Sequence, residues 1–287
     1  MEHSREREGD PPAYSIGTGQ FVRYLDYELE SEISVITTSM NYAEYIEDCI
    51  KSVQEQQTPL KINHIIMDGG STDGTIKILE KFKDRIYYYV NKGESQTAAL
   101  NHAMKIIEEK FPKTDYIGWL NADDYYIPGG LEASLTALRR EKPEVAMTCG
   151  GFGLVTGISP PRRKVAPTQL KTDNYKVIPY VQMRRLAKGN QVCQPTVLIK
   201  MSSFRTLKDK YGYYFDPADG YTQDYDLWCR FIISGFKIRR IAYTVAMFRY
   251  HPRQMSQTHY PQQREAANKV LKRIHIWLAR VRKEGDE

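Results

Sequence analysis

From residue 33 onward the sequence alternates short apolar, β-branched runs with segments of helical periodicity, and no other feature restricts the fold as strongly. The strand-like runs are ISVITT (33–38), NHIIMD (63–68), RIYYYV (85–90) and YIGWLN (116–121). After the first of them, Ile46, Ile50 and Val53 recur at the spacing of one helix face. Strands that alternate with helices through short connections predict an α/β sandwich, in which helices cover both faces of a central, mostly parallel sheet.

Length and composition place this sheet in one large domain. A chain of 287 residues with 41% hydrophobic and 26% charged residues is ordinary for a folded globular protein. Its net charge of +6 comes without the dense basic runs of nucleic-acid binders, so no nucleic-acid partner is expected. The four cysteines form no CxxC pair, and neither a signal sequence nor a run of about 18 apolar residues appears. These features predict reduced thiols and a cytoplasmic location.

The chain divides into three predicted regions. Residues 1–31 are polar and charged without clear periodicity, which predicts a flexible or loosely docked extension. Residues 32–255 form the main domain, and within it the segment 157–192 is rich in Pro, Lys and Arg. That segment predicts either a long excursion covering a cleft or an irregular basic surface. Residues 256–287 are predicted to form a basic amphipathic helix.

Polar side chains stand where three of the predicted strands end. Thr38 ends the first strand, Asp68 ends the second, and Asp123 and Asp124 follow the fourth. In doubly wound sheets, ligands bind beyond the carboxyl ends of the strands. We therefore expect these residues to converge on one crevice.

Asp68 opens the motif DGGSTDGT (68–75), whose glycines permit a turn that brings backbone close to a ligand. Asp73 or Thr72 in its second half accounts for a helix cap but leaves Asp68 unexplained. A carboxylate at this place can accept the N3–H of a uracil or thymine ring, a proton that cytosine lacks.

The adjacent acids Asp123 and Asp124 directly follow an apolar run. Because unpaired buried charge is costly, such acids cap a helix, lie in solvent or bind a cation. Capping needs one short polar side chain, which Asn121 also supplies. Two acids at the mouth of a nucleotide-sized crevice favour a divalent cation that bridges carboxylate and diphosphate oxygens.

The segment TQDYDLWCRF (222–231) holds two acids, which helical geometry separates. Leu227, Trp228 and Phe231 form the predicted inward stripe. Asp224 lies on that stripe, one turn before Trp228, whereas Asp226 lies roughly opposite and is expected to face solvent. Asp224 is therefore the candidate general base.

Taken together, these motifs resemble the family-2 nucleotide-sugar glycosyltransferases. The resemblance rests on ISVITTSMN, IIMDGGSTDGT, GWLNADD, QPTVLIK and TQDYDLW in this order, and covers roughly residues 33–255. It implies a GT-A-like, Rossmann-type sandwich, with a nucleotide-binding half at 32–125 and an acceptor half at 126–255. It also implies inverting transfer from a nucleoside-diphosphate sugar, with UDP favoured, to a glycan or lipid-linked acceptor, with Mg²⁺ or Mn²⁺ as cofactor.

The resemblance also assigns roles by position. It implies that Thr38 and Asp68 hold the nucleotide base, that Asp123 contacts the ribose or the sugar, that Asp124 binds the metal, and that Asp224 is the catalytic base.

The sequence departs from the family pattern at some positions. The acid-acid pair often seen at the base is Gln223-Asp224 here, which removes one carboxylate. GESQTAALN (93–101) matches the family loosely and places Gln96 in the nucleotide site. FRYHPRQMS (248–256) resembles the family's His-containing segment, where His251 either reaches the metal or diphosphate or is structural.

The C-terminal segment 262–283 has one apolar face and one basic face. The apolar face consists of Ala267, Val270, Leu271, Ile274, Trp277, Leu278 and Val281. Packing of this face on the parent domain is the favoured interpretation. The alternative is peripheral docking on an anionic membrane surface, which would suit a lipid-linked acceptor.

Other functions fit the sequence less well. A sugar-nucleotide nucleotidyltransferase usually has a Gly-rich, basic loop after its first strand, where this chain has TTSMNYAEY. A non-catalytic nucleotide- or glycan-binding relative is expected to lack Asp124 or Asp224, and both are present. A dehydrogenase is weaker still, since no GxGxxG follows the first strand.

Overall fold

A computed structural model describes residues 31–157 and 179–284. All of the predicted N-terminal extension except Ser31, and most of the predicted excursion at 157–192, lie outside the described residues. The strands are β1 (Glu32–Ser39), β2 (Lys61–Asp68), β3 (Tyr87–Val90), β4 (Thr114–Trp119), β5 (Tyr125–Tyr126), β6 (Val145–Thr156), β7 (Val197–Lys200) and β8 (Lys237–Tyr250). The helices are α1 (Ile46–Gln54), α2 (Thr75–Lys81), α3 (Gln96–Lys110), α4 (Gly130–Arg139), α5 (Pro179–Leu186), η1 (Gln194–Thr196), α6 (Met201–Tyr211), α7 (Gln223–Ile233), α8 (Met255–Thr258) and α9 (Tyr260–Glu284).

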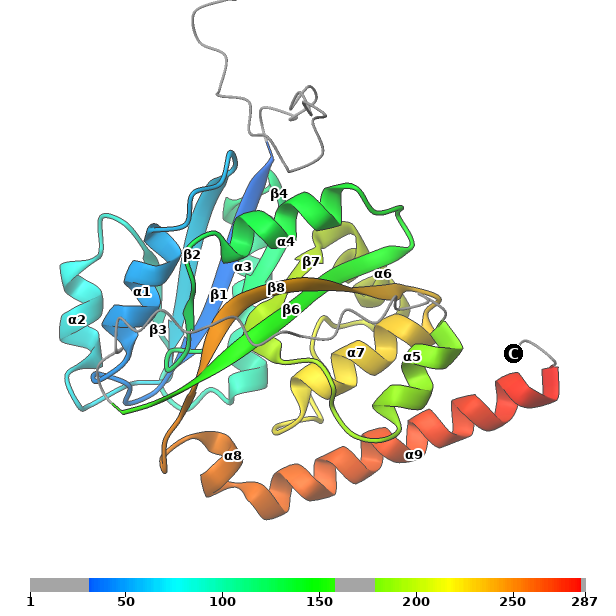
Figure 1. The fold of residues 1–287 in the computed structure, drawn as a ribbon. Coiled ribbons are helices and arrows are strands. Elements are labelled where there is room, and N and C mark those ends of the chain that lie inside the picture. The colour runs from blue at the N-terminus through cyan, green and yellow to red at the C-terminus, as the bar shows by residue number, and fades with distance from the viewer. Residues whose placement is uncertain (1–30, 158–178, 285–287) are drawn as a thin grey trace, which may run out of the picture.

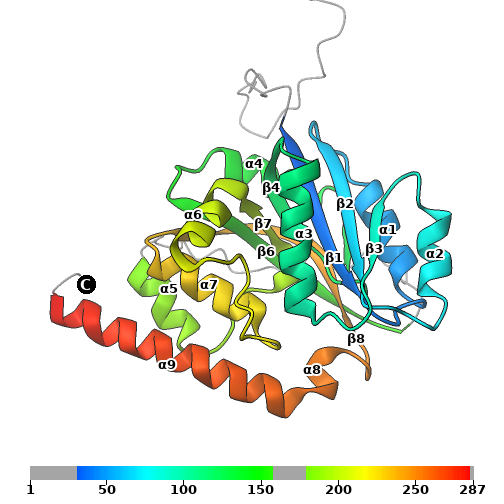
Figure 2. The ribbon, with the colours of Figure 1, turned by 180° about the vertical axis from the view of Figure 1, so that it is seen from behind.

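These strands form one sheet in the order β3-β2-β1-β4-β7-β6-β8-β5. The first four in that order run parallel, β7 is antiparallel to both β4 and β6, and β8 is parallel to β6. Helices α1 and α4 lie on one face of the sheet (Figure 1), and α3, α6 and α7 lie on the other (Figure 2). The predicted mostly parallel sheet with helices on both faces is thus confirmed.

The strand β1 is buried on both faces, as its nearly continuous apolar sequence requires. Val35 and Ile33 pack with residues of α1 and α4. Ile36, one position on from Val35, packs in the larger core with Leu100 and Met104 of α3 on the opposite face. Alternate residues of a strand point to opposite faces, so β1 joins two hydrophobic cores.

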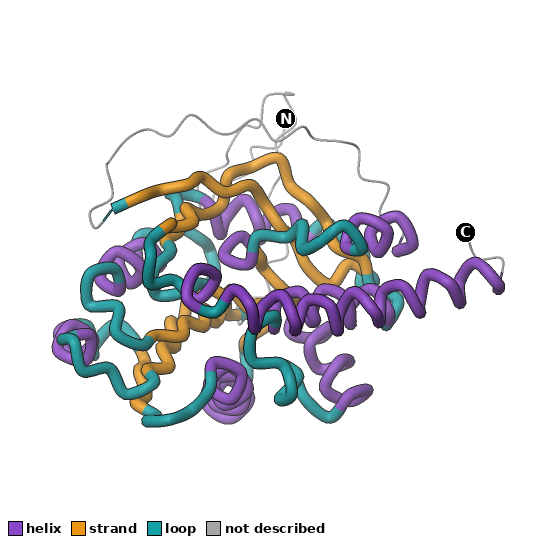
Figure 3. The backbone as a smooth tube through the Cα atoms, turned by 90° about the horizontal axis from the view of Figure 1, so that it is seen from below, coloured by secondary structure: helices purple, strands orange, loops and turns teal. Residues whose placement is uncertain are grey.

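The C-terminal helix α9 packs along the domain, where it contacts α5 and α7 (Figure 3). Val270 is 1% exposed and Ile274 is 0% exposed. Trp277 and Leu278 are partly buried against the same core. The favoured interpretation, packing of the apolar face on the domain, is what the structure shows. Within the described part of the chain, no helix has the length and apolar character needed to cross a bilayer.

Candidate functional site

The carboxyl ends of β1, β2 and β4 lie at one edge of the sheet, which is the lower edge in Figure 1. At this edge Ser39 of β1 pairs in register with Asp68 of β2. Thr38 stands one position earlier, and Asp123 and Asp124 follow β4. All of these side chains are buried, with Asp68 and Asp124 each only 1% exposed. The strand-end residues therefore gather where the sequence predicts, in surroundings that penalise uncompensated charge.

Asp68 shapes the turn that follows β2. Its Oδ1 accepts hydrogen bonds from the backbone N–H groups of Gly70 (3.0 Å) and Ser71 (2.7 Å), and its Oδ2 accepts one from Ser71 Oγ (2.6 Å). Gly70 has a φ of +96°, a left-handed conformation that favours glycine. The second half of the motif starts α2, where Asp73 Oδ1 accepts hydrogen bonds from the N–H (3.0 Å) and hydroxyl (2.6 Å) of Thr75. A carboxylate has about four acceptor positions, and these contacts occupy three of them in Asp68.

Thr38 and Gln96 meet although they are far apart in the sequence. Gln96 Nε2, at the start of α3, donates to Thr38 Oγ1 over 3.0 Å. Gln223 Nε2, at the start of α7, in turn donates to Thr97 Oγ1 over 3.0 Å and lies 3.5 Å from Gln96 Oε1. These contacts connect the end of β1 with the residue directly before Asp224. Gln223, which replaces a family acid, therefore links α3 with α7.

The acid pair after β4 is held by Arg249 of β8, whose side chain is fully buried. Arg249 Nε donates to the carbonyl of Asp123 (2.8 Å), and its backbone N–H donates to Asp124 Oδ1 (2.8 Å). Its other guanidinium nitrogens donate to the Gly157 carbonyl (2.6 Å) and to Asp48 Oδ2 (3.1 Å). One residue of a distant strand thus holds the backbone at Asp123 and one carboxylate oxygen of Asp124.

The second oxygen of Asp124 is left without a partner. Among the described residues no group donates to Asp124 Oδ2, although the atom is buried. Burial, and then the negative charge of Asp123, raise the pKa of Asp124 well above its usual value. Such a carboxylate is stabilised by a cation, so this orphaned oxygen fits a metal ligand. No group of three or more metal-binding side chains occurs in the residues that the structure covers, so a cation here needs ligand oxygens from a substrate or water.

His251 lies beside the acid pair and is only 4% exposed. Its Nε2 is 3.0 Å from Asp123 Oδ2, and Tyr45 packs on the imidazole with ring centroids 4.8 Å apart. Nδ1 of His251 is buried and has no hydrogen-bond partner in the described chain. The structure thus places His251 beside the acids, with one ring nitrogen that no described residue contacts.

Asp224 occupies the first turn of α7, where its carboxylate is partly buried. Asn190 Nδ2 donates to Asp224 Oδ2 over 2.7 Å, and the N–H of Tyr225 donates to Oδ1 over 2.7 Å. Burial raises the pKa of Asp224 to about 6, and these two hydrogen bonds oppose the rise. A carboxylate with a pKa near neutrality is suited to accept a proton during a reaction.

The expectation that Asp226 faces solvent is wrong. Asp226 is 0% exposed and forms ion pairs with Arg230 of α7 (2.6 Å) and with Arg273 of α9. The physical reason is that α9 covers the side of α7 opposite the Leu227–Trp228 stripe. Two arginines pair with this acid inside the protein, so Asp226 holds α9 to α7 and is not a second candidate base.

The charges of Asp124 and Asp224 both influence the thiol of Cys193. Burial raises the pKa of Cys193, and the charges of both Asp124 and Asp224 raise it further. Hydrogen bonds of the same segment, 190–194, support this neighbourhood, since Asn190 contacts Asp224 and Gln194 contacts Asn121 and the Trp119 carbonyl at the end of β4. Through Gln223, Gln96 and Thr38, the same region is connected to the carboxyl end of β1.

Three residues contribute to the site that the sequence did not single out, namely Arg249, Asn190 and Gln194. Gln194 joins the β4 end to the segment before β7, since its Oε1 accepts from Asn121 Nδ2 (2.8 Å) and its Nε2 donates to the Trp119 carbonyl (2.6 Å). Gln194 and Arg249 lie in the motifs QPTVLIK and FRYHPRQMS, but nothing in these motifs marked the two residues themselves, and Asn190 lies in no motif.

Comparison with known proteins decides the family. The model of glycosyl transferase family 2 matches residues 34–211. The chain belongs to this family. It is 29% identical over 202 residues to an uncharacterized glycosyltransferase of Rickettsia typhi, a match that covers 70% of this chain and 58% of the relative. The chain therefore spans little more than half the length of that relative.

Solved structures show the same fold. Crystalline S. aureus TarS in complex with UDP-GlcNAc superimposes with a TM-score of 0.58 at 16% identity, over 83% of this chain and 65% of that one. The mannosyltransferase PcManGT from Pyrobaculum calidifontis, in complex with GDP-Man and Mn²⁺, gives a TM-score of 0.55 at 17% identity, over 86% of this chain and 69% of that one. These likenesses confirm the predicted GT-A fold of this family-2 chain.

Proposed function

We propose that this family-2 chain is a metal-dependent, inverting glycosyltransferase. It moves a sugar from a UDP-linked donor to a hydroxyl of a glycan or lipid-linked acceptor. The observation that carries the proposal is the segment 190–194, in which Asn190 contacts Asp224 and Gln194 contacts both Asn121 and the Trp119 carbonyl beside the acid pair. Asp124 has an unsatisfied buried oxygen, and Asp224 has a pKa near 6.

Asp224 is the proposed catalytic base. An acceptor hydroxyl becomes a good nucleophile when a carboxylate takes its proton as the new bond forms. Asp224 holds such a carboxylate in a defined orientation, since Asn190 and the Tyr225 amide each donate to one of its oxygens. Attack from the face opposite the leaving diphosphate inverts the anomeric carbon, so one base suffices.

Asp124 and His251 are the proposed metal ligands, through Asp124 Oδ2 and His251 Nδ1. When bound there, Mg²⁺ or Mn²⁺ neutralises the charge that develops on the departing diphosphate. Arg249 keeps Asp124 in place through its backbone N–H, and Asp123 orients His251 by the contact to Nε2. Asp123 is also the proposed contact to the ribose or the sugar.

Thr38, Asp68 and Gln96 form the proposed base-binding part of the site. Thr38 and Gln96 are joined by a hydrogen bond, and Asp68 retains one acceptor position beyond its three contacts to the turn. An acceptor in this place matches the N3–H of uracil. The UDP-GlcNAc complex of TarS, which shares the fold, supports UDP as the donor nucleotide.

A reducing, cytoplasmic setting is part of the proposal. The structure contains four cysteines without disulfides in the described chain, and three of them are buried.

Peripheral membrane contact through 262–283 is also part of the proposal. The apolar face of α9 is covered by the domain, so this contact uses the basic outer face of the helix. Replacing exposed Lys269 and Lys272 by Glu would abolish anionic-vesicle binding if this contact exists.

A nucleotide-sugar panel tests the proposed function. The melting temperature of the full chain is measured with UDP-, TDP- and GDP-sugars, each with and without Mn²⁺. We expect the largest rise with a UDP-sugar plus Mn²⁺, followed by release of UDP when an acceptor is added. If no nucleotide sugar stabilises the protein under either condition, the proposed function is refuted.

A further inference from the structure

The loop directly before α7 carries a tyrosine that packs on a histidine from the other side of the site. The ring of Tyr221 lies against the imidazole of His259, with ring centroids 5.5 Å apart and planes inclined by 30°. We refer to these two residues as the aromatic pair. Both are only partly buried, so each ring keeps some surface open to a ligand. None of the roles proposed above for the donor, the metal or the base uses the aromatic pair.

Tyr221 belongs to the same end of α7 as the candidate base. Thr222 is the N-cap residue of α7, and Asp224 occupies the first turn of the helix. Consecutive Cα atoms are about 3.8 Å apart, so the Cα atoms of Tyr221 and Asp224 are separated by at most about 11 Å. A sugar whose hydroxyl reaches the Asp224 carboxylate therefore lies close to Tyr221.

The backbone that carries Tyr221 is held by Asp219, which is buried. Asp219 Oδ1 accepts hydrogen bonds from the N–H groups of Tyr221 (3.0 Å) and Thr222 (2.8 Å), and its Oδ2 accepts one from the Thr222 hydroxyl (2.8 Å). The hydroxyl of Thr97, on α3, donates to the Asp219 carbonyl. An aromatic ring on a backbone that is already ordered loses little freedom when a ligand packs on it.

His259 is held by a segment that starts at the acid pair. His251, which contacts that pair, donates its N–H to Oε1 of buried Gln254 (2.8 Å). The Gln254 carbonyl accepts from the N–H (3.1 Å) and hydroxyl (3.2 Å) of Thr258, whose Oγ1 lies 2.9 Å from His259 Nδ1. The segment 251–259, with α8 at the lower edge of the sheet in Figure 1, thus connects the proposed metal site with the aromatic pair.

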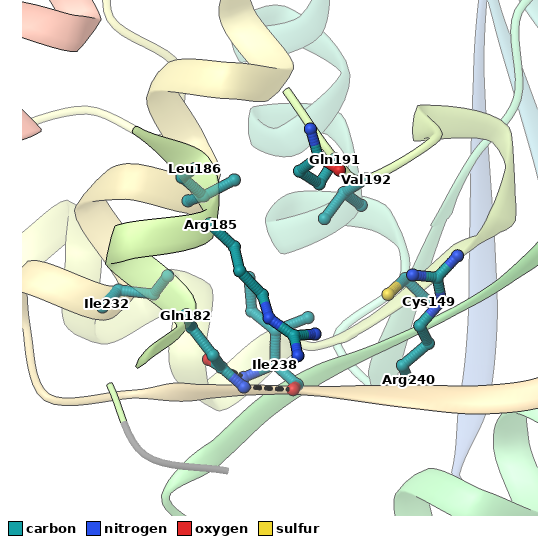
Figure 4. A pocket seen from close by; sticks show the side chains of 9 residues that line it. All are labelled: Cys149, Gln182, Arg185, Leu186, Gln191, Val192, Ile232, Ile238 and Arg240. Atoms are coloured by element: carbon teal, nitrogen blue, oxygen red, sulfur yellow. Dashed lines mark hydrogen bonds between the residues drawn. The ribbon is translucent and has the colours of Figure 1, made fainter. Parts of the chain in front are cut away.

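The first turn of α7 also borders the segment 190–193, since Asn190 donates to Asp224. Behind this segment lies a cavity of about 40 Å³, lined by Val192 and by residues of α5, α7, β6 and β8 (Figure 4). A cavity needs about 10–15 Å³ to hold one water molecule, so this one has no room for a sugar ring. The partly exposed aromatic pair is not limited in this way.

The chemistry of aromatic rings favours a sugar at this place. One face of a pyranose ring carries C–H groups with a slight positive charge, and the face of an aromatic ring is negative. Contact between the two faces also buries apolar surface. A flexible alcohol has hydroxyl groups but no ring face, so it gains little from such a contact.

We propose that the aromatic pair is an acceptor subsite that packs on the C–H face of a pyranose ring. The acceptor is then a glycan, and its reacting hydroxyl reaches Asp224 while one of its rings lies on Tyr221. The assignment rests on the proposed function, because it takes Asp224 as the base. His259 holds the ring of Tyr221 in place and enlarges the surface, and neither residue takes part in proton transfer.

The test compares ring-shaped and flexible probes on the full-length chain. Dissociation constants are measured by saturation-transfer NMR, with and without UDP and Mn²⁺. The ring probes are the methyl β-D-glycosides of glucose, galactose and N-acetylglucosamine, and the flexible probe is glycerol. The variants are Tyr221→Leu, which removes the aromatic face, and Tyr221→Phe, which keeps it. Tyr260→Leu is the matched control, because Tyr260 is 61% exposed, adjoins His259 and is not part of the aromatic pair.

We expect at least one glycoside to bind about tenfold more tightly than glycerol, with the strongest saturation transfer at its ring C–H protons. Tyr221→Leu should lose about tenfold in affinity, because it loses both apolar burial and attraction to the ring face. Tyr221→Phe and Tyr260→Leu should bind like the wild type. The proposal is overturned if no glycoside binds more tightly than glycerol, if Tyr221→Leu retains wild-type affinity, or if either Tyr221→Phe or Tyr260→Leu loses as much as Tyr221→Leu.

Failure of this inference is separable from failure of the proposed function. The wild-type comparison of glycosides with glycerol needs no variant, so it decides even if a substitution prevents folding. For each variant, an unchanged thermal shift with a UDP-sugar and Mn²⁺ shows that the fold and the donor site are intact. A chain that is stabilised by UDP and Mn²⁺ but binds no glycoside would retain the proposed function and lose the acceptor subsite.

Discussion

The protonation of Asp224 is expected to set the acidic limit of glycosyl transfer. Only the carboxylate accepts a proton from the acceptor, and burial raises the pKa of Asp224 from 3.8 to about 6. With that pKa the ionised fraction is about 90% at pH 7 and about 10% at pH 5. The turnover number should therefore fall about tenfold between these pH values. An unperturbed aspartate would remain more than about 90% ionised at pH 5 and give almost no loss.

The assay measures UDP release at saturating donor, acceptor and Mn²⁺, from pH 4.5 to 8. Saturation matters because Asp124 also has a raised pKa, and acid would otherwise weaken metal binding. Replacing Asn190 by Ala isolates the contribution of Asp224. Asn190 donates to the Asp224 carboxylate and stabilises its charged form, so its loss should raise the pKa and move the acid limb to higher pH.

The size of that displacement follows from the hydrogen bond. A bond to a charged group is worth about 1.5–3 kcal/mol, and about 1.4 kcal/mol corresponds to one pH unit. Because Asn190 is exposed and water partly replaces it, we expect a displacement of about half a unit to one unit. An acid limb that stays in place in Asn190→Ala, or that is absent above pH 5 in the wild type, would refute Asp224 as the titrating base.

Four further substitutions test the site and its supports. Asp224→Asn should abolish transfer and leave UDP binding unchanged. It should also raise the melting temperature at pH 7. The raised pKa of Asp224 means that the free energy of unfolding falls as the pH rises through about 4 to 6, and the uncharged amide avoids this loss. Asp124→Asn should remove the Mn²⁺-dependent part of the thermal shift given by a UDP-sugar, and a retained Mn²⁺ effect would contradict its role. Arg249→Lys should lower the free energy of unfolding, measured by denaturant titration, by about 2–4 kcal/mol, because the buried carbonyl acceptors lose their donors. The control Arg253→Lys changes an exposed ion pair and should alter the same free energy by less than about 1 kcal/mol. Asp226→Asn should cost about 3 kcal/mol by the same measurement, since it leaves buried Arg230 without its anion, and a neutral effect would show that the ion pair does not hold α9.

The strand ends were predictable because their signal is local and strong. Thr38, Asp68 and Asp124 each stand at or just after the end of a largely apolar segment, and such segments are buried in a two-sided sheet. Parallel strands then bring their carboxyl ends to the same edge of the sheet. No knowledge of the partner strand is needed for either step, and both were confirmed by the fold.

The second half of the sheet was harder to predict, and glycine is the reason. The strand β6 contains Gly150 and Gly151, which in sequence are typical of a loop. In the structure a Cβ at Gly150 would lie 2.4 Å from Val245 Cγ2 and 2.8 Å from the Tyr243 carbonyl. Glycine is needed there because β6 and β8 approach each other closely, a requirement that becomes visible only once the two strands are paired.

Site residues that the sequence did not reveal also depend on partners that are distant in the chain. Asp124 was found from its own surroundings, but its orientation is set by Arg249, 125 positions later, and Asp224 is oriented by Asn190, 34 positions earlier. Helical periodicity failed for Asp226 for a related reason, since it assumes solvent opposite the apolar stripe, where α9 supplies Arg273 instead. Residues that bear the chemistry are marked by their own local surroundings, whereas the residues that hold them are recognised only from contacts made in the folded chain. Because Arg249 holds Asp124 through a backbone N–H that every substitution retains, Asn190→Ala is the direct test of whether the site works by orientation as well as by the identity of its acids.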